Sequence, residues 1–127
     1  MNGNWYPWGQ NPPATFKSAW RRIVSIFRSE GATNVRWVWT PYVDQNRLPF
    51  KRYYPGDAWV DWAGLDGFNW GNPFQSFREV FEASYRSMVR LTSKPLMIAE
   101  TGSVEGAGEA KSIWIRTAVR RILPRLK

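Results

Sequence analysis

Segments with strand composition alternate with amphipathic helical segments along the chain. Runs rich in β-branched, aromatic or aliphatic residues lie at residues 34–40, 63–68 and 96–100. Segments in which apolar residues recur with helical period lie at residues 16–27, 77–91 and 110–123. Strands that alternate with helices in this way favour parallel βα units. The sequence therefore predicts an α/β fold with a small parallel sheet.

Local signals mark the ends of several elements. Thr15 is the expected N-cap of the first helix, and Ser76 with Glu79 three residues later has the spacing of a capping box before the second. Residues 60–62 are expected to form one helical turn. The run at residues 96–100 is continuously apolar up to its last residue, which is typical of a strand buried on both faces of a parallel sheet.

The chain is too short for a closed α/β barrel. It has 127 residues, whereas eight parallel strands with their helices need about 250. The pattern also starts in a loop and stops on a helix. We therefore expect residues 1–127 to be the middle of a larger fold.

Two absent residue types limit the chemistry. The sequence contains no cysteine and no histidine. This excludes disulfides, zinc sites built from Cys and His, and nucleophilic pairs that need His. We expect neither a metal ion nor another cofactor, so carboxylates, Lys, Tyr and hydroxyl groups remain for chemistry.

The net charge of +8 favours an acidic partner, and a nucleic-acid-binding module is one alternative. Its basic residues fall on the expected outer helix faces, whereas the aromatic residues lie mainly in loops. Proteins that bind single strands interleave the two types, so we expect no nucleic-acid partner.

No apolar run approaches the roughly 18 residues of a membrane span, and the first residues lack the pattern of a signal peptide. We expect no membrane partner either.

Glu100 has the sequence setting of a catalytic carboxylate. It ends the apolar run PLMIAE, and active sites of parallel α/β barrels lie at the carboxyl ends of strands. Carbohydrate hydrolysis uses two carboxylates and aromatic faces that hold sugar rings. Asp66 and Asp57 are candidates for the second carboxylate, although neither has the setting of Glu100. A structural role for Glu100, as a cap or in an ion pair with an Arg, is the alternative.

Four sequence blocks resemble those of glycoside hydrolase family 26. They are MNGNWYPWG at residues 1–9, WVWTP at residues 37–41, YYPGDAWVDWAGLDGFNWG at residues 53–71 and KPLMIAETGS at residues 94–103. Their order and spacing match the family, which contains β-mannanases and related endo-β-glucanases and xylanases. The resemblance implies a retaining mechanism and the fold of a partial (β/α)8 barrel. Residues 1–127 would then be a fragment of a glycoside hydrolase catalytic domain that spans the loop after strand 4 through helix 7. The resemblance also implies that Glu100 is the catalytic nucleophile.

The resemblance also shows what this sequence lacks. In the family the first block reads His-Glu-Met-Asn-Gly, and that Glu is the general acid/base, so its expected position is immediately before Met1. Many members carry a Tyr, hydrogen-bonded to the nucleophile, where this chain has Phe68. The chain alone is therefore expected to be inactive or nearly so. A non-catalytic remnant that still binds glycan is an alternative to an intact enzyme.

The expected partner is a polysaccharide or oligosaccharide, and the sequence leaves the oligomeric state open. An extracellular or periplasmic location is implied only by the resemblance. The expected substrate-binding residues are aromatic and polar side chains of the loops and strand ends, namely Asn2, Trp5, Trp8, Trp39, Asp66, Phe68, Asn69 and Trp70. Trp5 falls on the family's sugar-stacking tryptophan. Trp37 is expected to point away from Trp39, into the layer between sheet and helices.

Overall fold

The computed structural model describes residues 2–5, 9, 11–44, 49–108 and 110–125. Its helices are α1 (Pro13–Ser29), α2 (Phe77–Leu91) and α3 (Ala110–Thr117), and its strands are β1 (Val38–Trp39), β2 (Trp62–Asn69) and β3 (Leu96–Ser103). Short 3-10 helices lie at Phe50–Tyr53 and Asp57–Trp59. The last helix continues as a π-helix at Ala118–Ile122 and a 3-10 turn at Leu123–Arg125.

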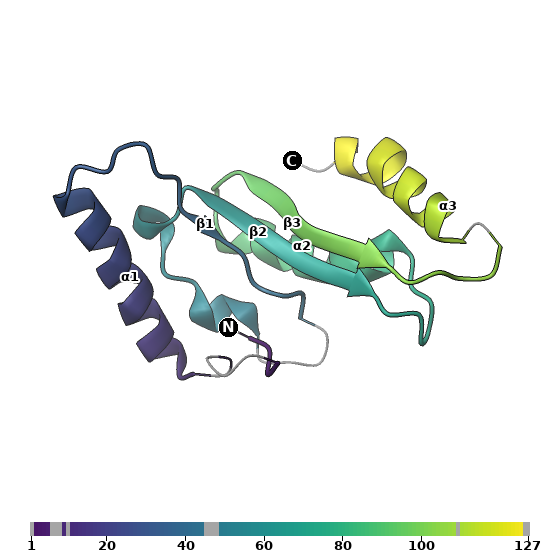
Figure 1. Cartoon of the computed structure of the whole chain (residues 1–127), viewed down its shortest axis with the longest axis horizontal. Helices are drawn as coiled ribbons and strands as arrows, with labels where there is room; N and C mark the ends of the chain where they lie inside the picture. Colours follow the sequence, from purple (N-terminus) through teal and green to yellow (C-terminus); the bar gives the residue numbers. More distant parts are fainter. Residues whose placement is uncertain (1, 6–8, 10, 45–48, 109, 126–127) are drawn as a thin grey trace.

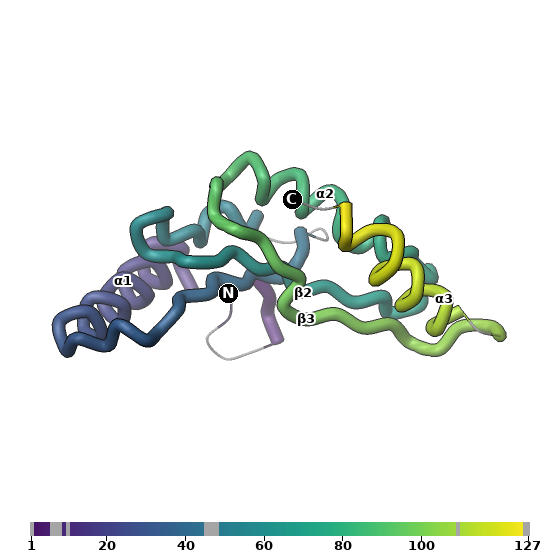
Figure 2. Tube along the Cα trace, turned by 90° about the horizontal axis from the view of Figure 1, so that it is seen from above, coloured from purple at the N-terminus to yellow at the C-terminus, as the bar shows by residue number. Residues whose placement is uncertain are grey.

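The strands form one parallel sheet in the order β1-β2-β3. This confirms the prediction of parallel βα units. The helices α1 and α3 lie at opposite ends of the molecule, with the sheet and α2 between them (Figures 1 and 2). None of the helices in the described residues is long and apolar enough to cross a membrane.

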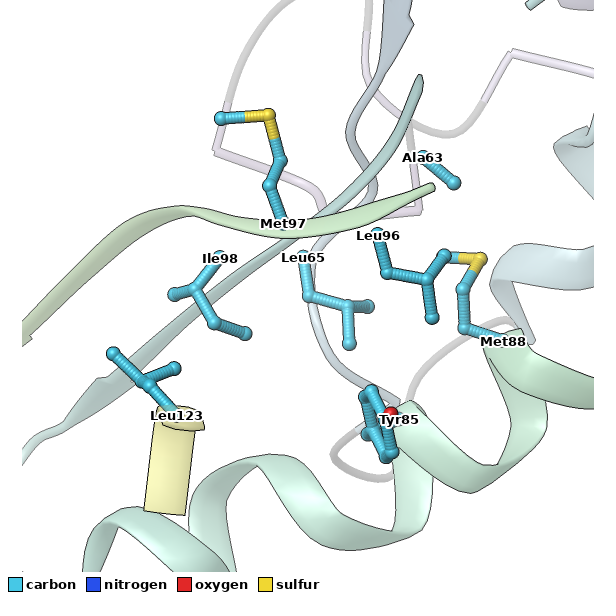
Figure 3. A pocket seen from close by; sticks show the side chains of 8 residues that line it. All are labelled: Ala63, Leu65, Tyr85, Met88, Leu96, Met97, Ile98 and Leu123. Atoms are coloured by element: carbon cyan, nitrogen blue, oxygen red, sulfur yellow. The ribbon is translucent and has the colours of Figure 1, made fainter. Parts of the chain in front are cut away.

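One face of the sheet packs against the helices. Figure 3 shows Leu65 of β2 and Leu96 and Ile98 of β3 pointing toward α2, while Met97 points the opposite way. Between these strands and α2 an apolar cavity of about 240 Å³ remains. The approach of α2 depends on Gly67, because a Cβ there would lie 2.9 Å from the Phe81 ring. The opposite face of the sheet is open to solvent at Met97, which is 41% exposed.

Hydrogen bonds from side chains fasten α1 to the segment before β2. The Arg21 guanidinium donates twice to the Pro55 carbonyl, at 2.9 and 2.7 Å, and Trp20 Nε1 donates to the Trp59 carbonyl at 2.9 Å. The Arg21 guanidinium also lies 5.9 Å from the centre of the Trp59 ring, a cation–π geometry. The helix is therefore held by polar contacts as well as by apolar packing.

Two expected element boundaries need correction. The prediction that Thr15 caps α1 is wrong: the helix begins at Pro13, with Pro12 as the capping residue, because Pro is well suited to the first helical turn. The helical turn expected at residues 60–62 lies instead at Asp57–Trp59. The backbone N–H groups of residues 61 and 62 both donate to the Trp37 carbonyl, so this segment already pairs with the chain leading into β1.

The burial predicted for the third strand also needs correction. Leu96 and Ile98 are half-buried, but Met97 and Ala99 are exposed. In the described part of the chain β3 pairs only with β2, and the face opposite the helices is uncovered. The capping box, in contrast, is confirmed. The Ser76 hydroxyl accepts from the Glu79 backbone N–H, and the Glu79 carboxylate accepts from the Ser76 backbone N–H.

A polar cluster joins the loops at the amino-terminal ends of β2 and β3. The Tyr54 hydroxyl donates to Asp57 Oδ1 at 2.6 Å, and the Thr92 hydroxyl donates to the same oxygen at 2.8 Å. These bonds hold the pKa of Asp57 below its usual value of 3.8. Burial, together with the Asp57 contact, raises the pKa of Tyr54 to about 12. The folded state therefore favours the ionised Asp57 and the neutral Tyr54.

Replacing Asp57 by Asn is expected to lower the free energy of unfolding by about 1 kcal/mol at pH 7. The hydrogen bonds from Tyr54 and Thr92 weaken because they lose a charged acceptor, and the effect stays small because Asp57 is solvent-exposed. A depressed carboxyl pKa stabilises the fold above the unfolded pKa and is lost as pH falls through the folded value. Thermal unfolding of both proteins between pH 7 and pH 2.5 would measure this. The gap in melting temperature should close below about pH 4, and a gap independent of pH would contradict the role of the charge.

Candidate active site

Three side chains occupy neighbouring positions across the sheet. Tyr42, just after β1, forms a parallel bridge with Asp66 of β2, and Asp66 pairs in register with Glu100 of β3. Backbone hydrogen bonds fix Asp66 to the segment after β1. The Asp66 N–H donates to the Pro41 carbonyl at 3.0 Å, and the Asp66 carbonyl accepts from the Val43 N–H at 2.9 Å. A phenol and two carboxyl groups thus lie in one row at the same level of the sheet.

A β-bulge determines which way Glu100 points. Leu65 pairs with Ile98, but the next residue, Asp66, pairs with Glu100, so Ala99 is an extra residue in β3. Successive side chains of a strand alternate between faces, and one inserted residue reverses the alternation. Without the bulge Glu100 would share the helix-facing side with Ile98. With it, Glu100 lies on the open face together with Asp66.

Asp66 is the buried member of the carboxyl pair. Its Oδ1 atom is shielded from solvent and has no hydrogen-bond partner among the described residues, while its carboxylate accepts a hydrogen bond from the Glu100 backbone N–H. Burial and, next, the negative charge of Glu100 raise the pKa of Asp66 to about 7. Glu100 itself is exposed. The site therefore combines one accessible carboxylate with one carboxyl group that holds its proton up to near-neutral pH.

An aromatic cluster lies beside this row, made of Trp5, Tyr42, Phe68 and Trp70. The Tyr42 ring meets the edge of Trp5 at 5.1 Å between centroids and stacks near-parallel to Phe68 at 6.4 Å. Phe68 lies 5.4 Å from Trp70, whose Nε1 donates to the Tyr42 hydroxyl at 3.0 Å. Trp5 is 50% exposed and Trp70 is 66% exposed. Both indoles thus offer apolar surface of the kind that packs against sugar rings.

The two asparagines expected to contact substrate have structural roles instead. Asn2 is buried, and its amide makes a reciprocal pair with the Tyr42 backbone, donating to the carbonyl at 2.7 Å and accepting from the N–H at 3.1 Å. Asn69 is also buried. Its Nδ2 donates to the Ser103 hydroxyl, and its Oδ1 accepts from the backbone N–H groups of Gly71 and Gln75. Asn2 fixes the N-terminal segment to the strand end, and Asn69 shapes the loop after β2.

Trp39, another expected substrate-binding residue, lies in the core. Trp39 is 0% exposed and packs on Phe50 and Tyr54, with centroids 6.1 and 4.9 Å away. Trp37 contacts Phe27 of α1 at 5.2 Å, so its predicted direction toward the helices is confirmed. The two tryptophans do not point apart, however, because residues two positions apart share one face of a strand. Both belong to the layer between sheet and helices.

Trp8, the remaining aromatic candidate, lies outside the described residues. Tyr42 was not singled out by the sequence analysis, although it follows Pro41 at a strand end and therefore falls where barrel sites form. Among the residues that the structure describes, no three acidic side chains gather as a metal ion would require. The site thus consists of the row Tyr42–Asp66–Glu100 and the aromatic cluster around it.

Comparisons with known proteins agree on one family. The sequence pattern described as glycosyl hydrolase family 26 matches residues 1–118. Endoglucanase H of Acetivibrio thermocellus is 40% identical over 135 residues, which cover 95% of this chain and 15% of that protein. A mannan endo-1,4-beta-mannosidase of Bacillus subtilis is 29% identical over 134 residues, covering 98% of this chain and 34% of that protein.

Solved structures show the same relationship. The Bacillus subtilis mannanase BCman matches with a TM-score of 0.64 and 25% identity, over 95% of this chain and 36% of that one. The family 26 domain of an endo-beta-mannanase/endo-beta-glucanase from Prevotella bryantii matches with a TM-score of 0.64 and 28% identity, over 80% of this chain and 30% of that one. The chain thus spans about a third of these structures, and its three-stranded parallel sheet fits part of a barrel. This chain belongs to glycosyl hydrolase family 26.

Proposed function

We propose that this chain is part of a retaining glycoside hydrolase that cleaves β-1,4-linked polysaccharide, mannan or β-glucan, with Glu100 as the nucleophile. The observation that carries the proposal is the position of Glu100: an exposed carboxylate on the open face of the sheet, in register with Asp66, which lies two residues before Phe68 on β2. The names of the relatives, an endoglucanase and mannan endo-1,4-beta-mannosidases, support both substrates.

The chemistry assigned to Glu100 is double displacement. A carboxylate oxygen of Glu100 attacks the anomeric carbon, a C–O ester bond forms, and the glycosidic C–O bond breaks with its electron pair on the leaving oxygen. That oxygen must receive a proton from a general acid. Water then attacks the same carbon, a general base takes its proton, and the Glu100 carboxylate leaves. Retention of the anomeric configuration follows from the two inversions.

The general acid/base is the part of this mechanism that we do not assign to a described residue. In the family, the Glu that acts as general acid/base comes immediately before the position that matches Met1, and by this likeness the chain corresponds to the loop after strand 4 through helix 7 of the barrel. General acid–base assistance contributes roughly 10²- to 10⁴-fold to rate. We therefore propose that residues 1–127 alone do not hydrolyse polysaccharide at an appreciable rate.

Trp5 and Trp70 are the proposed sugar platforms. The exposure of both indoles, the contact of Trp5 with Tyr42 and the contact of Trp70 with Phe68 support this role. Trp8 remains a further candidate from sequence. An extracellular or periplasmic location is proposed because the polymeric substrates of such enzymes lie outside the cell.

The test compares the chain with a polypeptide extended upstream in the same reading frame. Release of reducing sugar from mannan and from mixed-linkage β-glucan is the measurement. We expect background rates from residues 1–127 and an increase of more than about 10²-fold when a His-Glu pair directly precedes Met1. Full activity of residues 1–127 would contradict the proposal that this chain alone has no general acid/base. Oligosaccharide binding without turnover by the extended protein would favour the alternative, a non-catalytic glycan-binding remnant.

A further inference from the structure

We propose that Asp66 and Glu100 form a coupled carboxyl pair that carries a single negative charge, with the proton on Asp66 and the charge on Glu100. A protonated Asp66 then places no second negative charge beside the nucleophile. The inference rests on the proposed role of Glu100. It goes further because it gives the neighbouring carboxyl group a function of its own.

The geometry of the sheet brings the two groups together. Asp66 and Glu100 are in-register partners on adjacent parallel strands, and such strands lie about 4.8 Å apart. The extra residue Ala99 turns both carboxyl groups to the same face. Two carboxylates that share a site cannot both ionise at low cost, and the more buried one retains its proton. Asp66 is the more buried one, since its Oδ1 is shielded and Glu100 is exposed.

The other groups around Asp66 do not change the assignment of the proton to Asp66. Tyr42 faces it from the segment after β1 and supplies a phenol, and Phe68 follows on the same face of β2 and supplies an apolar ring. The positive charge of the chain's amino terminus acts to lower the pKa of Asp66, as does the Glu100 backbone N–H, but burial and the Glu100 charge outweigh them. The unpartnered Oδ1 is therefore a natural place for the proton.

The coupling has a consequence for the reaction. When Glu100 becomes a glycosyl ester its negative charge disappears, and with it goes the second of the two causes that raise the pKa of Asp66, while the larger cause, burial, remains. The Asp66 proton becomes easier to lose in the intermediate, because no charge remains on Glu100 to oppose an ionised Asp66. When water releases the ester, the returning Glu100 charge again favours a protonated Asp66.

The test measures how Asp66 titrates in the 127-residue chain. Carbodiimide coupling of glycine methyl ester modifies protonated carboxyl groups, and peptide mass spectrometry gives its rate at each pH for each carboxyl, at concentrations too low for aggregation. We expect the midpoint for Asp66 near pH 7 in the unmodified sequence. Glu100→Gln imitates the neutral ester and should lower that midpoint by about one pH unit. Glu100→Asp keeps the charge and should leave the midpoint raised.

Controls separate coupling from unfolding and from failure of the proposed function. Glu105→Gln removes a carboxylate from the loop after β3 and should not move the Asp66 midpoint. Asp57 reports folding in the same experiment, because its depressed pKa depends on Tyr54 and Thr92 and would rise toward 3.8 in an unfolded chain. An Asp66 midpoint near pH 4 in the unmodified sequence, or one unaffected by Glu100→Gln while Asp57 stays depressed, would overturn the pair. The titration needs no turnover, so it can succeed even if hydrolysis is never observed.

Discussion

Replacing Glu100 by Gln is expected to abolish covalent capture of a sugar by this chain. A dinitrophenyl glycoside has a leaving group acidic enough to depart without a proton donor, so the first displacement does not need a general acid. The unmodified chain should gain the mass of one glycosyl unit on the peptide that contains Glu100. In the variant the rate should fall on the order of 10⁴-fold or more, the scale observed when an enzyme loses its nucleophile.

Glu105→Gln is the matched control for this experiment. Glu105 lies a few residues beyond Glu100, in the loop after β3, where it pairs with Lys111 at 3.1 Å. Its variant should capture sugar at the unmodified rate. Mannosyl and glucosyl reagents used side by side would show which sugar the site prefers. Capture that persists in Glu100→Gln, or that maps to another carboxyl group, would refute the assignment of the nucleophile.

The approximate location of the site was predictable from sequence, but its geometry was not. Strand composition placed Asp66 and Glu100 near the ends of parallel strands, so their meeting at one edge followed from topology. Nothing in the run PLMIAE indicates that Ala99 is an extra residue. A regular ladder would have sent Glu100 toward the helices, and only the three-dimensional pairing shows the bulge that turns it to the open face.

Errors about individual side chains share a physical cause. Asn2 and Asn69 were expected to bond sugar because Asn is polar, yet their amides satisfy backbone and hydroxyl groups of this chain. A buried polar group must find a partner, and sequence does not say whether that partner is a ligand or the protein. Tyr42 was missed for the same reason, since its importance comes from contacts with residues distant in sequence.

Replacing Trp39 by Ala is expected to have the largest effect on stability. The side chain is 0% exposed and lies in the core against Phe50 and Tyr54. Truncating a buried aromatic residue to Ala costs about 3–5 kcal/mol. Trp39 Nε1 has no hydrogen-bond partner in the described structure, so its removal also relieves a cost of about 1–3 kcal/mol. Taking the middle of the two ranges, the net loss should be about 2 kcal/mol, measured by denaturant unfolding.

Trp70→Ala is the matched comparison, because the same substitution is made at a side chain that is 66% exposed. It removes one hydrogen bond to the Tyr42 hydroxyl and a contact with Phe68. The expected loss of stability is at most about 1 kcal/mol. Its effect should appear in binding, as a several-fold loss of affinity for manno- or cello-oligosaccharides, which corresponds to about 1 kcal/mol.

The two variants together separate packing from recognition. Trp39→Phe adds a third point, since it keeps an aromatic ring in the core and removes the unpartnered N–H, and it should recover most of the stability lost in Trp39→Ala. Well below its melting temperature Trp39→Ala should bind oligosaccharide as the unmodified chain does, because Trp39 has no surface to offer a sugar. A stable Trp39→Ala protein with impaired binding would place Trp39 in the site after all. The comparison is informative because both losses begin from the same residue type, at one buried and one exposed position.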